Sequence, residues 1–267
     1  MILRIDSLSR YFGGIRAIDE VSFDIEKGKV TAIIGPNGAG KTTLFSVVCG
    51  FLAPHRGRVE LEGSDITGLP PYRIAAAGIV RTFQLVRLFK EMSLRENVMV
   101  GGHLATKGGL WSALLRPGWY RKEQRELART ADENLSMVGL GSLADARAST
   151  LTYGQQRRLE IARALAAQPR LLLLDEPAAG LSASESRELL GIIRSVTEGG
   201  TSVMLIDHDM SLVMEVADKI VVLDFGRKIC EGTPDVVRQD AQVLHAYLGK
   251  SERSSRLRGK RKNPAVE

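Results

Sequence analysis

The sequence predicts an α/β fold with a parallel central sheet, an antiparallel β layer and an inserted helical subdomain. Short apolar segments alternate with helical patterns along most of the 267 residues, which is typical of a parallel sheet. Residues 3–8 and 18–25 instead alternate apolar and polar positions, which is typical of antiparallel strands. Residues from about 90 to 158 contain no such strand, and they form the expected subdomain.

The strands of the parallel sheet are short, apolar and bounded by polar or glycine-containing turns. The sequence predicts them at residues 30–34, 79–82, 171–175, 203–207 and 219–224. A long helix is predicted over Glu123–Leu140, because apolar residues recur on one face at Leu127, Ala131, Leu135 and Val138.

The segment before this helix differs in composition. Residues 101–120 are rich in glycine and contain Trp111 and Trp119, so a loop or irregular insertion is expected near residues 105–118. The two tryptophans are either packing residues or part of a docking surface.

Composition excludes several classes of protein. The chain is 44% hydrophobic and 25% charged, which suits a folded domain of this length. No uncharged apolar run reaches the roughly 18 residues that span a bilayer. Residues 1–10 lack the apolar stretch of a signal peptide. Cys49 and Cys230 are the only cysteines, so we expect reduced thiols and no disulfide framework.

The net charge of +6 is unevenly distributed. Residues 250–267 hold seven basic and two acidic residues, a charge of +5, which leaves +1 for residues 1–249. We therefore expect one nearly neutral folded domain over residues 1–249 and a basic, disordered tail over residues 250–267. The tail is either simply solvated or in contact with anionic lipid or a partner. The body has no excess of basic residues, so no nucleic acid partner is expected.

The strongest motif follows the predicted strand at residues 30–34 and precedes a helical pattern. It has the form GxxxxGK[ST], in which glycines let backbone N–H groups surround phosphate oxygens at a helix N-terminus. Lys41 can reach the β- and γ-phosphates of a nucleotide, and the Thr42 hydroxyl can bind Mg²⁺. The nucleotide-binding residues predicted here are Gly35, Pro36, Asn37, Gly38, Ala39, Gly40, Lys41, Thr42 and Thr43.

Two carboxylates end the leucine-rich strand predicted at residues 171–175. Because ligands of α/β sheets lie at the carboxyl ends of strands, Asp175 and Glu176 should face the phosphates. Asp175 would hold Mg²⁺, and Glu176 would polarise the attacking water as general base. The alternative is that both acids merely cap the next helix.

Residues 151–160 read LTYGQQRRLE at the start of a helical pattern, just before this strand. The segment resembles the LSGGQ signature of ABC (ATP-binding cassette) ATPases. The resemblance implies that Thr152, Gly154 and Gln155 contact the γ-phosphate of ATP on an opposing subunit. Tyr153 departs from the pattern, because it replaces the first glycine of the signature.

Other positions also match ABC motifs in order. Gln84 resembles the Q-loop glutamine that senses Mg²⁺ and the attacking water, and His208 resembles the switch histidine that contacts the γ-phosphate. Phe12 matches the aromatic residue that stacks on adenine, with Tyr11 as a possible substitute. Ser182 replaces the usual aspartate of the D-loop. The resemblance covers about residues 1–249 and implies ATP and Mg²⁺ as cofactors.

Within ABC ATPases the chain resembles the LivG type, an ATPase of branched-chain amino acid importers. The strings RTFQ, YGQQRRLEIAR, DEPAAGL and HDM carry this resemblance. It implies a peripheral subunit at the cytoplasmic face of the membrane that docks on separate permease subunits, with Arg87, Leu88 and Phe89 near the contact. The resemblance also implies a second ATPase subunit, either LivF-like or another copy of this chain, that completes the ATP sites. A periplasmic or extracellular solute-binding protein is implied as an indirect partner.

Three alternatives remain open from the sequence. The first is an importer whose solute is another small amino acid or an amide. The second is a soluble ABC ATPase without a transport role, although the chain has neither a long coiled-coil insertion nor a second cassette. The third is a non-catalytic nucleotide-binding regulator, and the presence of Asp175, Glu176 and His208 argues against it.

Overall fold

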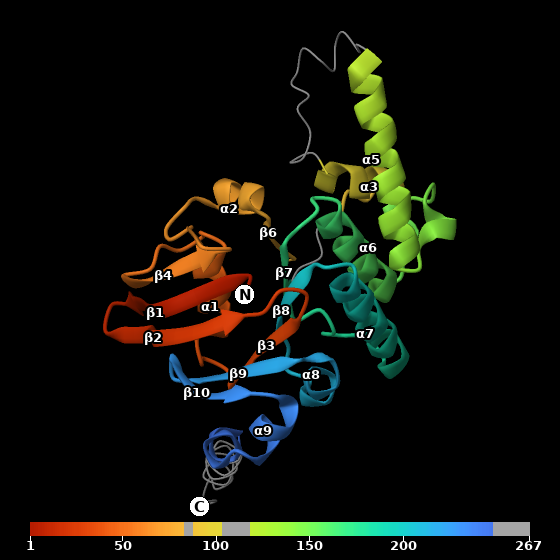
Figure 1. The fold of residues 1–267 in the computed structure, drawn as a ribbon. Helices are drawn as coiled ribbons and strands as arrows, with labels where there is room; N and C mark the ends of the chain where they lie inside the picture. Colours follow the sequence, from red (N-terminus) through yellow and green to blue (C-terminus); the bar gives the residue numbers. More distant parts are fainter. Residues whose placement is uncertain (83–87, 103–117, 248–267) are drawn as a thin grey trace, which may run out of the picture.

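The computed structural model describes residues 1–82, 88–102 and 118–247, and these residues form two sheets (Figure 1). The smaller sheet has the strand order β2-β1-β4-β5, and the larger has the order β10-β9-β3-β8-β7-β6. The strands are β1 (Leu3–Phe12), β2 (Ile15–Ile25), β3 (Val30–Ile34), β4 (Arg56–Leu61), β5 (Ser64–Asp65), β6 (Ile79–Arg81), β7 (Leu171–Asp175), β8 (Ser202–Ile206), β9 (Lys219–Asp224) and β10 (Arg227–Gly232).

The helices connect and flank these strands. They are α1 (Lys41–Val48), α2 (Pro71–Ala77), α3 (Leu94–Gly101), α5 (Gly118–Met137), α6 (Tyr153–Leu165), α7 (Ala183–Glu198), α8 (Met210–Val216) and α9 (Pro234–Gln239). Two short 3₁₀ helices, η2 (Gly141–Leu143) and η3 (Ala148–Thr150), lie between α5 and α6.

The larger sheet is parallel except for β10, which pairs antiparallel with β9 at one edge. Strand β7 shows how the larger sheet is buried on both faces. Leu171 and Leu173 belong to a core on one face of the sheet, whereas Leu172 and Leu174 belong to the core on the other. Since both faces are buried, an uninterrupted leucine run satisfies the alternation of strand side chains.

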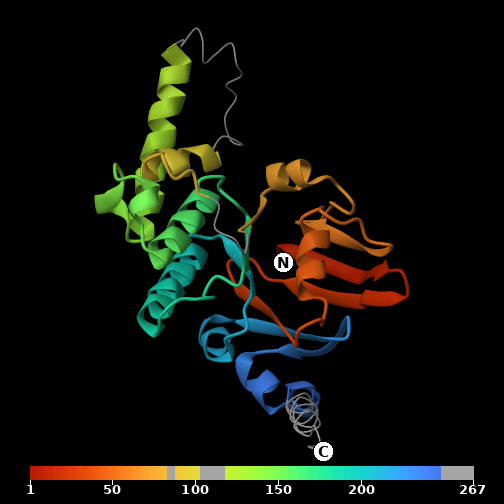
Figure 2. The ribbon, with the colours of Figure 1, turned by 180° about the vertical axis from the view of Figure 1, so that it is seen from behind.

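The two faces of the larger sheet are covered differently. Helix α1 packs between this sheet and the antiparallel sheet, with Leu44, Phe45 and Val48 in their shared core. Helices α7 and α8 contribute to the core on the opposite face. Helices α3, α5 and α6 contact one another, and they lie on the far side of the larger sheet from β1 and β2 in both views (Figures 1 and 2).

The predicted fold class is confirmed, and most predicted strands agree with the structure to within a residue or two. Strands β4, β5 and β10 were not predicted. The helix predicted over Glu123–Leu140 is found over Gly118–Met137. It ends early because Gly139 adopts a left-handed conformation, φ 71°, while Leu140 N–H donates to the Leu135 carbonyl at 2.7 Å. This is the hydrogen bonding of a Schellman end.

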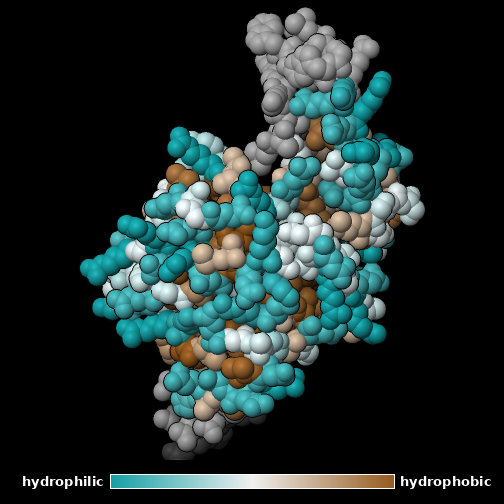
Figure 3. Space-filling view, viewed as in Figure 1, coloured by the Kyte–Doolittle hydropathy of each residue, from teal (hydrophilic) through white to brown (hydrophobic). Residues whose placement is uncertain are grey.

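Two predicted regions fall outside the part of the chain that the structure describes. They are the insertion expected near residues 105–118, apart from its last residue, and the basic tail at residues 250–267. Among the described residues, no helix has the length and apolar character that crossing a bilayer requires. The face seen in Figure 3 is mainly hydrophilic, with small, separate hydrophobic areas.

Candidate active site

The GxxxxGK[ST] segment forms the loop between β3 and α1. Gly40 is the N-cap of α1 at φ 104°, and no side chain caps this helix end. A Cβ atom on Gly40 would lie 2.2 Å from the Ala17 carbonyl oxygen, so no other residue fits without movement of the backbone. The exposed end of α1 therefore offers its N–H groups and its positive dipole to an anion.

Lys41 is the most constrained cation of this loop. Its side chain is buried, and Nζ donates to the Gly35 carbonyl at 2.7 Å and the Pro36 carbonyl at 3.1 Å. The ammonium group is thus held inside the loop by main-chain oxygens. Phosphate oxygens placed in the loop would meet a cation that is already in position.

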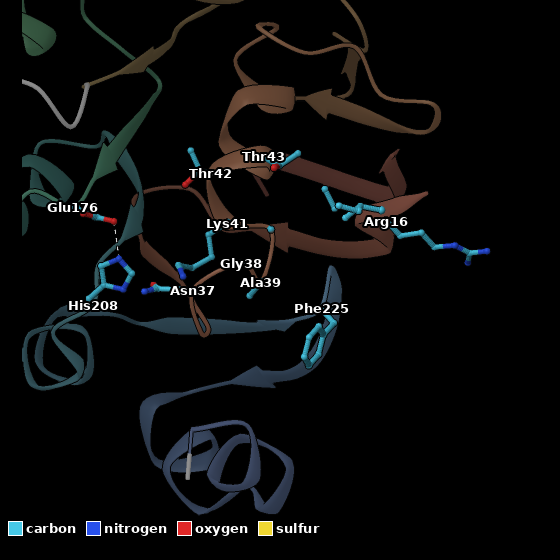
Figure 4. Close-up of a pocket in the computed structure, with 13 residues that line it drawn as sticks. Arg16, Asn37, Gly38, Ala39, Lys41, Thr42, Thr43, Glu176, His208 and Phe225 are labelled. Atoms are coloured by element: carbon cyan, nitrogen blue, oxygen red, sulfur yellow. Dashed lines mark hydrogen bonds and ion pairs between the residues drawn. The ribbon is translucent and has the colours of Figure 1, made fainter. Parts of the chain in front are cut away.

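A cavity of about 650 Å³ opens over this loop (Figure 4). Glu176 and His208 border the cavity near Lys41, and Phe225 and Arg16 border it farther along the loop. The complete lining is Ile15, Arg16, Ala17, Asn37, Gly38, Ala39, Gly40, Lys41, Thr42, Thr43, Glu176, His208 and Phe225. The cavity is therefore elongated, with an acid and an imidazole at one end and an aromatic ring at the other.

Glu176 and His208 interact directly. His208 Nε2 lies 2.7 Å from Glu176 Oε1, and the side chains are 50% and 18% exposed, respectively. Parallel pairing of β7 with β8 brings them together, since each follows the end of its strand at the same edge. Glu176 has φ 50°, an uncommon value for a residue with a side chain, and its N–H donates to the Ile206 carbonyl at 2.8 Å.

Asp207 holds together the two loops that carry Glu176 and His208. Its carboxylate accepts hydrogen bonds from the Ala178 N–H at 3.2 Å and the Asp209 N–H at 2.9 Å, so it connects the loops after β7 and β8. Burial raises the pKa of Asp207 above its usual value, and these hydrogen bonds act in the opposite direction. No local sequence signal pointed to Asp207, because its neighbour His208 carried the motif.

Asp175, the predicted metal ligand, is buried and forms an ion pair with Arg81. Arg81 Nη2 lies 2.5 Å from Asp175 Oδ2. Arg81 stands in the string RTFQ, but this string alone predicts no separate function for it. The structure thus adds a cation beside the predicted metal site.

The residues present fit the chemistry of Mg²⁺. The Thr42 hydroxyl and the Asp175 carboxylate are oxygen donors, which this hard cation prefers. Among the described residues, no cluster of three or more His, Cys, Asp or Glu could hold a metal ion. Phosphate and water oxygens would therefore supply most of the coordination, as is usual for Mg²⁺ bound with a nucleotide.

The signature residues lie at the start of α6 and do not line this cavity. Thr152 is the N-cap, and it forms a capping box with Gln155. Gln155 N–H donates to Thr152 Oγ1 at 3.3 Å, and Thr152 N–H donates to Gln155 Oε1 at 3.0 Å. Gly154 follows in the first turn of the helix. The Tyr153 hydroxyl accepts a hydrogen bond from Arg157 Nη2 at 2.8 Å.

The structure does not bring Phe12 into the cavity. Phe12 ends β1, and the Arg10 guanidinium lies 4.9 Å from its ring centroid. Tyr11, the possible substitute, stacks on His55 with the ring centroids 5.3 Å apart. Phe225, in the turn between β9 and β10, is the aromatic residue that lines the cavity, and the sequence offered no local signal for it. Gln84 lies outside the described residues.

A parallel sheet with a phosphate-binding loop after β3 and a carboxylate–imidazole pair beside it defines a P-loop nucleotide-binding protein. Comparison with known families narrows this class. The sequence model of the ABC transporter family matches residues 18–179. A second model, described as branched-chain amino acid ATP-binding cassette transporter, matches residues 227–253.

Known proteins agree with these matches. The high-affinity branched-chain amino acid transport ATP-binding protein BraF of Pseudomonas aeruginosa is 44% identical over 251 residues, covering 94% of this chain and 98% of BraF. LivG of Escherichia coli, with the same description, is 43% identical with the same coverage. The chain therefore belongs to the ABC transporter family, and it is an ATP-hydrolysing ATP-binding cassette.

Solved structures support the same assignment. The ADP conformation of MJ1267, an ATP-binding cassette of an ABC transporter, is similar with a TM-score of 0.81 and 35% identity, covering 93% of this chain and 98% of that one. A nucleotide-free cassette from an ABC transporter is similar with a TM-score of 0.79 and 34% identity, covering 92% of this chain and 98% of that one. Both likenesses extend over nearly the whole chain.

Proposed function

We propose that this protein is the ATPase subunit of an importer for branched-chain amino acids. The proposed ATP hydrolysis is supported mainly by the contact of Glu176 with His208 at the edge of the phosphate-loop cavity. The solute class rests on the likeness to BraF and LivG and on the family match at residues 227–253. Another small amino acid or an amide is the alternative solute.

ATP binds with its phosphates in the loop of residues 35–43, where Lys41 exchanges the Gly35 and Pro36 carbonyls for phosphate oxygens. Thr42 and Asp175 hold Mg²⁺, which neutralises phosphate charge when it is bound. Glu176 accepts a proton from the attacking water, and His208 turns from Glu176 to the γ-phosphate. Gln84 keeps its predicted role at the metal, whereas Phe12 does not line the cavity, and Phe225 is the aromatic side chain placed to contact the adenine.

A second ATPase subunit completes each site. Its signature segment, equivalent to Thr152, Gly154 and Gln155 here, closes over the γ-phosphate. The two subunits are either two copies of this chain or this chain with a LivF-like partner. The likeness to LivG favours the second arrangement.

The subunit docks on separate permease subunits at the cytoplasmic face of the membrane and receives the signal of a solute-binding protein through them. Phe89 supports a docking site near the end of β6, since it is 48% exposed and lines a cavity of about 330 Å³ together with Thr82 and Gly101. Arg87, which was assigned to the same contact, lies outside the described residues.

The decisive experiment compares ATP hydrolysis and ATP binding in Glu176→Gln. Loss of a general base is expected to lower turnover by about 100-fold or more, because the amide cannot accept the proton from water. ATP affinity should be nearly unchanged. Hydrolysis would be measured as phosphate release and binding by titration calorimetry.

Glu198→Gln is the matched control, since Glu198 is exposed at the end of α7. This variant should hydrolyse ATP like the wild type. Equal turnover in both variants would show that Glu176 is not the base.

A further inference from the structure

Arg81 occupies a position between the two strands and the helix that build the phosphate site. It ends β6, which pairs parallel with β7 so that Arg81 lies beside Leu173. Side chains two residues apart on a strand point to the same face, so Leu173 and Asp175 share the face of Arg81. The Arg81 side chain therefore reaches along β7 to the strand's terminal carboxylate.

The resulting ion pair is almost fully enclosed. The side chains of Arg81 and Asp175 are 10% and 7% exposed, and their atoms Nη2 and Oδ2 lie 2.5 Å apart. Solvent screens such a pair far less than it screens ion pairs at a surface. The negative charge of Asp175 is therefore largely compensated before any metal ion arrives.

The same guanidinium group reaches the phosphate-loop helix. Nη1 lies 3.4 Å from Ser46 Oγ, and the Phe45 ring centroid lies 5.6 Å from the Arg81 Cζ atom. Ser46 Oγ in turn donates to the Thr42 carbonyl at 2.8 Å. Arg81 thus connects the carboxylate at the end of β7 with the helical turn that carries the Thr42 hydroxyl.

We propose that Arg81 is a positioning residue that fixes Asp175 against α1 and lowers the affinity of this edge of the sheet for a divalent cation. A positive charge next to the carboxylate opposes binding of a second cation, so Mg²⁺ depends on the charge of the nucleotide phosphates to bind. The inference rests on the proposed Mg²⁺–nucleotide site and adds a residue that controls it.

The test measures the dissociation constant of ADP by calorimetry, once in excess Mg²⁺ and once in excess EDTA. The dissociation constant in EDTA divided by that in Mg²⁺ reports how much the metal contributes to ADP binding. This ratio can be measured without any ATP hydrolysis. In Arg81→Met the ratio should rise about tenfold, because the uncompensated carboxylate attracts the cation more strongly. Arg81→Lys keeps the charge and should return the ratio to within about threefold of the wild-type value.

Two further variants make the result specific. Arg81→Gln keeps a hydrogen-bond donor for Asp175 without the charge, and it should raise the ratio even if Arg81→Met does not fold. Arg170→Met removes an exposed cation at the opposite end of β7, where Arg170 pairs with Glu62, and it should leave the ratio unchanged.

An unchanged or lower ratio in folded Arg81→Met or Arg81→Gln would overturn the proposal for Arg81 alone. Failure of the wild type to bind ADP under both conditions would overturn the nucleotide site itself.

Discussion

At the scale of single residues, Gly40 meets two requirements of the phosphate loop. Its φ of 104° lies in the left-handed region, and its α-carbon approaches the Ala17 carbonyl too closely for a side chain. Such a conformation costs a residue with a Cβ atom on the order of 1–3 kcal/mol, apart from the clash. The motif glycine is therefore required by backbone geometry as well as by access of the ligand.

We expect Gly40→Ala to lower the free energy of unfolding by about 2 kcal/mol or more and to weaken ATP binding at least roughly tenfold. Gly14→Ala is the matched control, because a Cβ atom on Gly14 would meet no atom within 4 Å. Chemical denaturation and calorimetry measure both effects. Equal behaviour of the two variants would contradict this account of Gly40.

At the scale of elements, the start of α7 explains one departure from the ABC pattern. Ser182, in place of the usual aspartate, is the N-cap of α7, and its N–H donates to Glu185 Oε2 at 2.8 Å. Hydrogen bonds from Ser182 hold the pKa of Glu185 below its usual value of 4.5. This contribution to stability is present above that value and is lost as the pH falls through the lower, folded-state pKa.

Ser182→Ala should destabilise the protein by about 1 kcal/mol, which corresponds to roughly 2–4 °C in melting temperature. Ser182→Thr is the informative comparison, because threonine keeps both the capping oxygen and the hydroxyl that donates to Glu185 Oε2 at 2.7 Å. We expect its melting temperature to stay within about 1 °C of the wild-type value. A large loss in Ser182→Thr would show that Ser182 does more than cap α7.

At the scale of the whole molecule, the signature segment at the start of α6 lies outside the nucleotide cavity, although both belong to one chain. Under the proposed function, the signature segment of a second subunit completes the site. In Glu176→Gln with ATP and Mg²⁺, we expect light scattering to give the mass of one chain, since the likeness to LivG favours a different partner. Doubling of the mass would show instead that this chain closes on its own copy.

The elements that could be predicted from the sequence are those whose structure is determined by a local residue pattern. The strand–loop–helix around Lys41 and the leucine run of β7 carry their own signals, so their bounds agree with the structure. Strands β4 and β10 were missed because they are polar and partly exposed, and their pairing partners are not evident from local periodicity. The ion pair of Arg81 with Asp175 joins residues 94 positions apart, and Phe225 reaches the cavity from a hairpin turn, so neither had a local pattern.

The capping box of Thr152 and Gln155 has a consequence for the subunit before it meets its partner. The N-terminus of a helix attracts any small anion, but here an amide of the first turn is already hydrogen-bonded to a side chain of the same turn. An intramolecular acceptor competes at a high effective concentration, which a free phosphate ion in solution cannot match. A free phosphate ion would therefore gain less at this helix end than at one whose first-turn amides all lack an intramolecular acceptor.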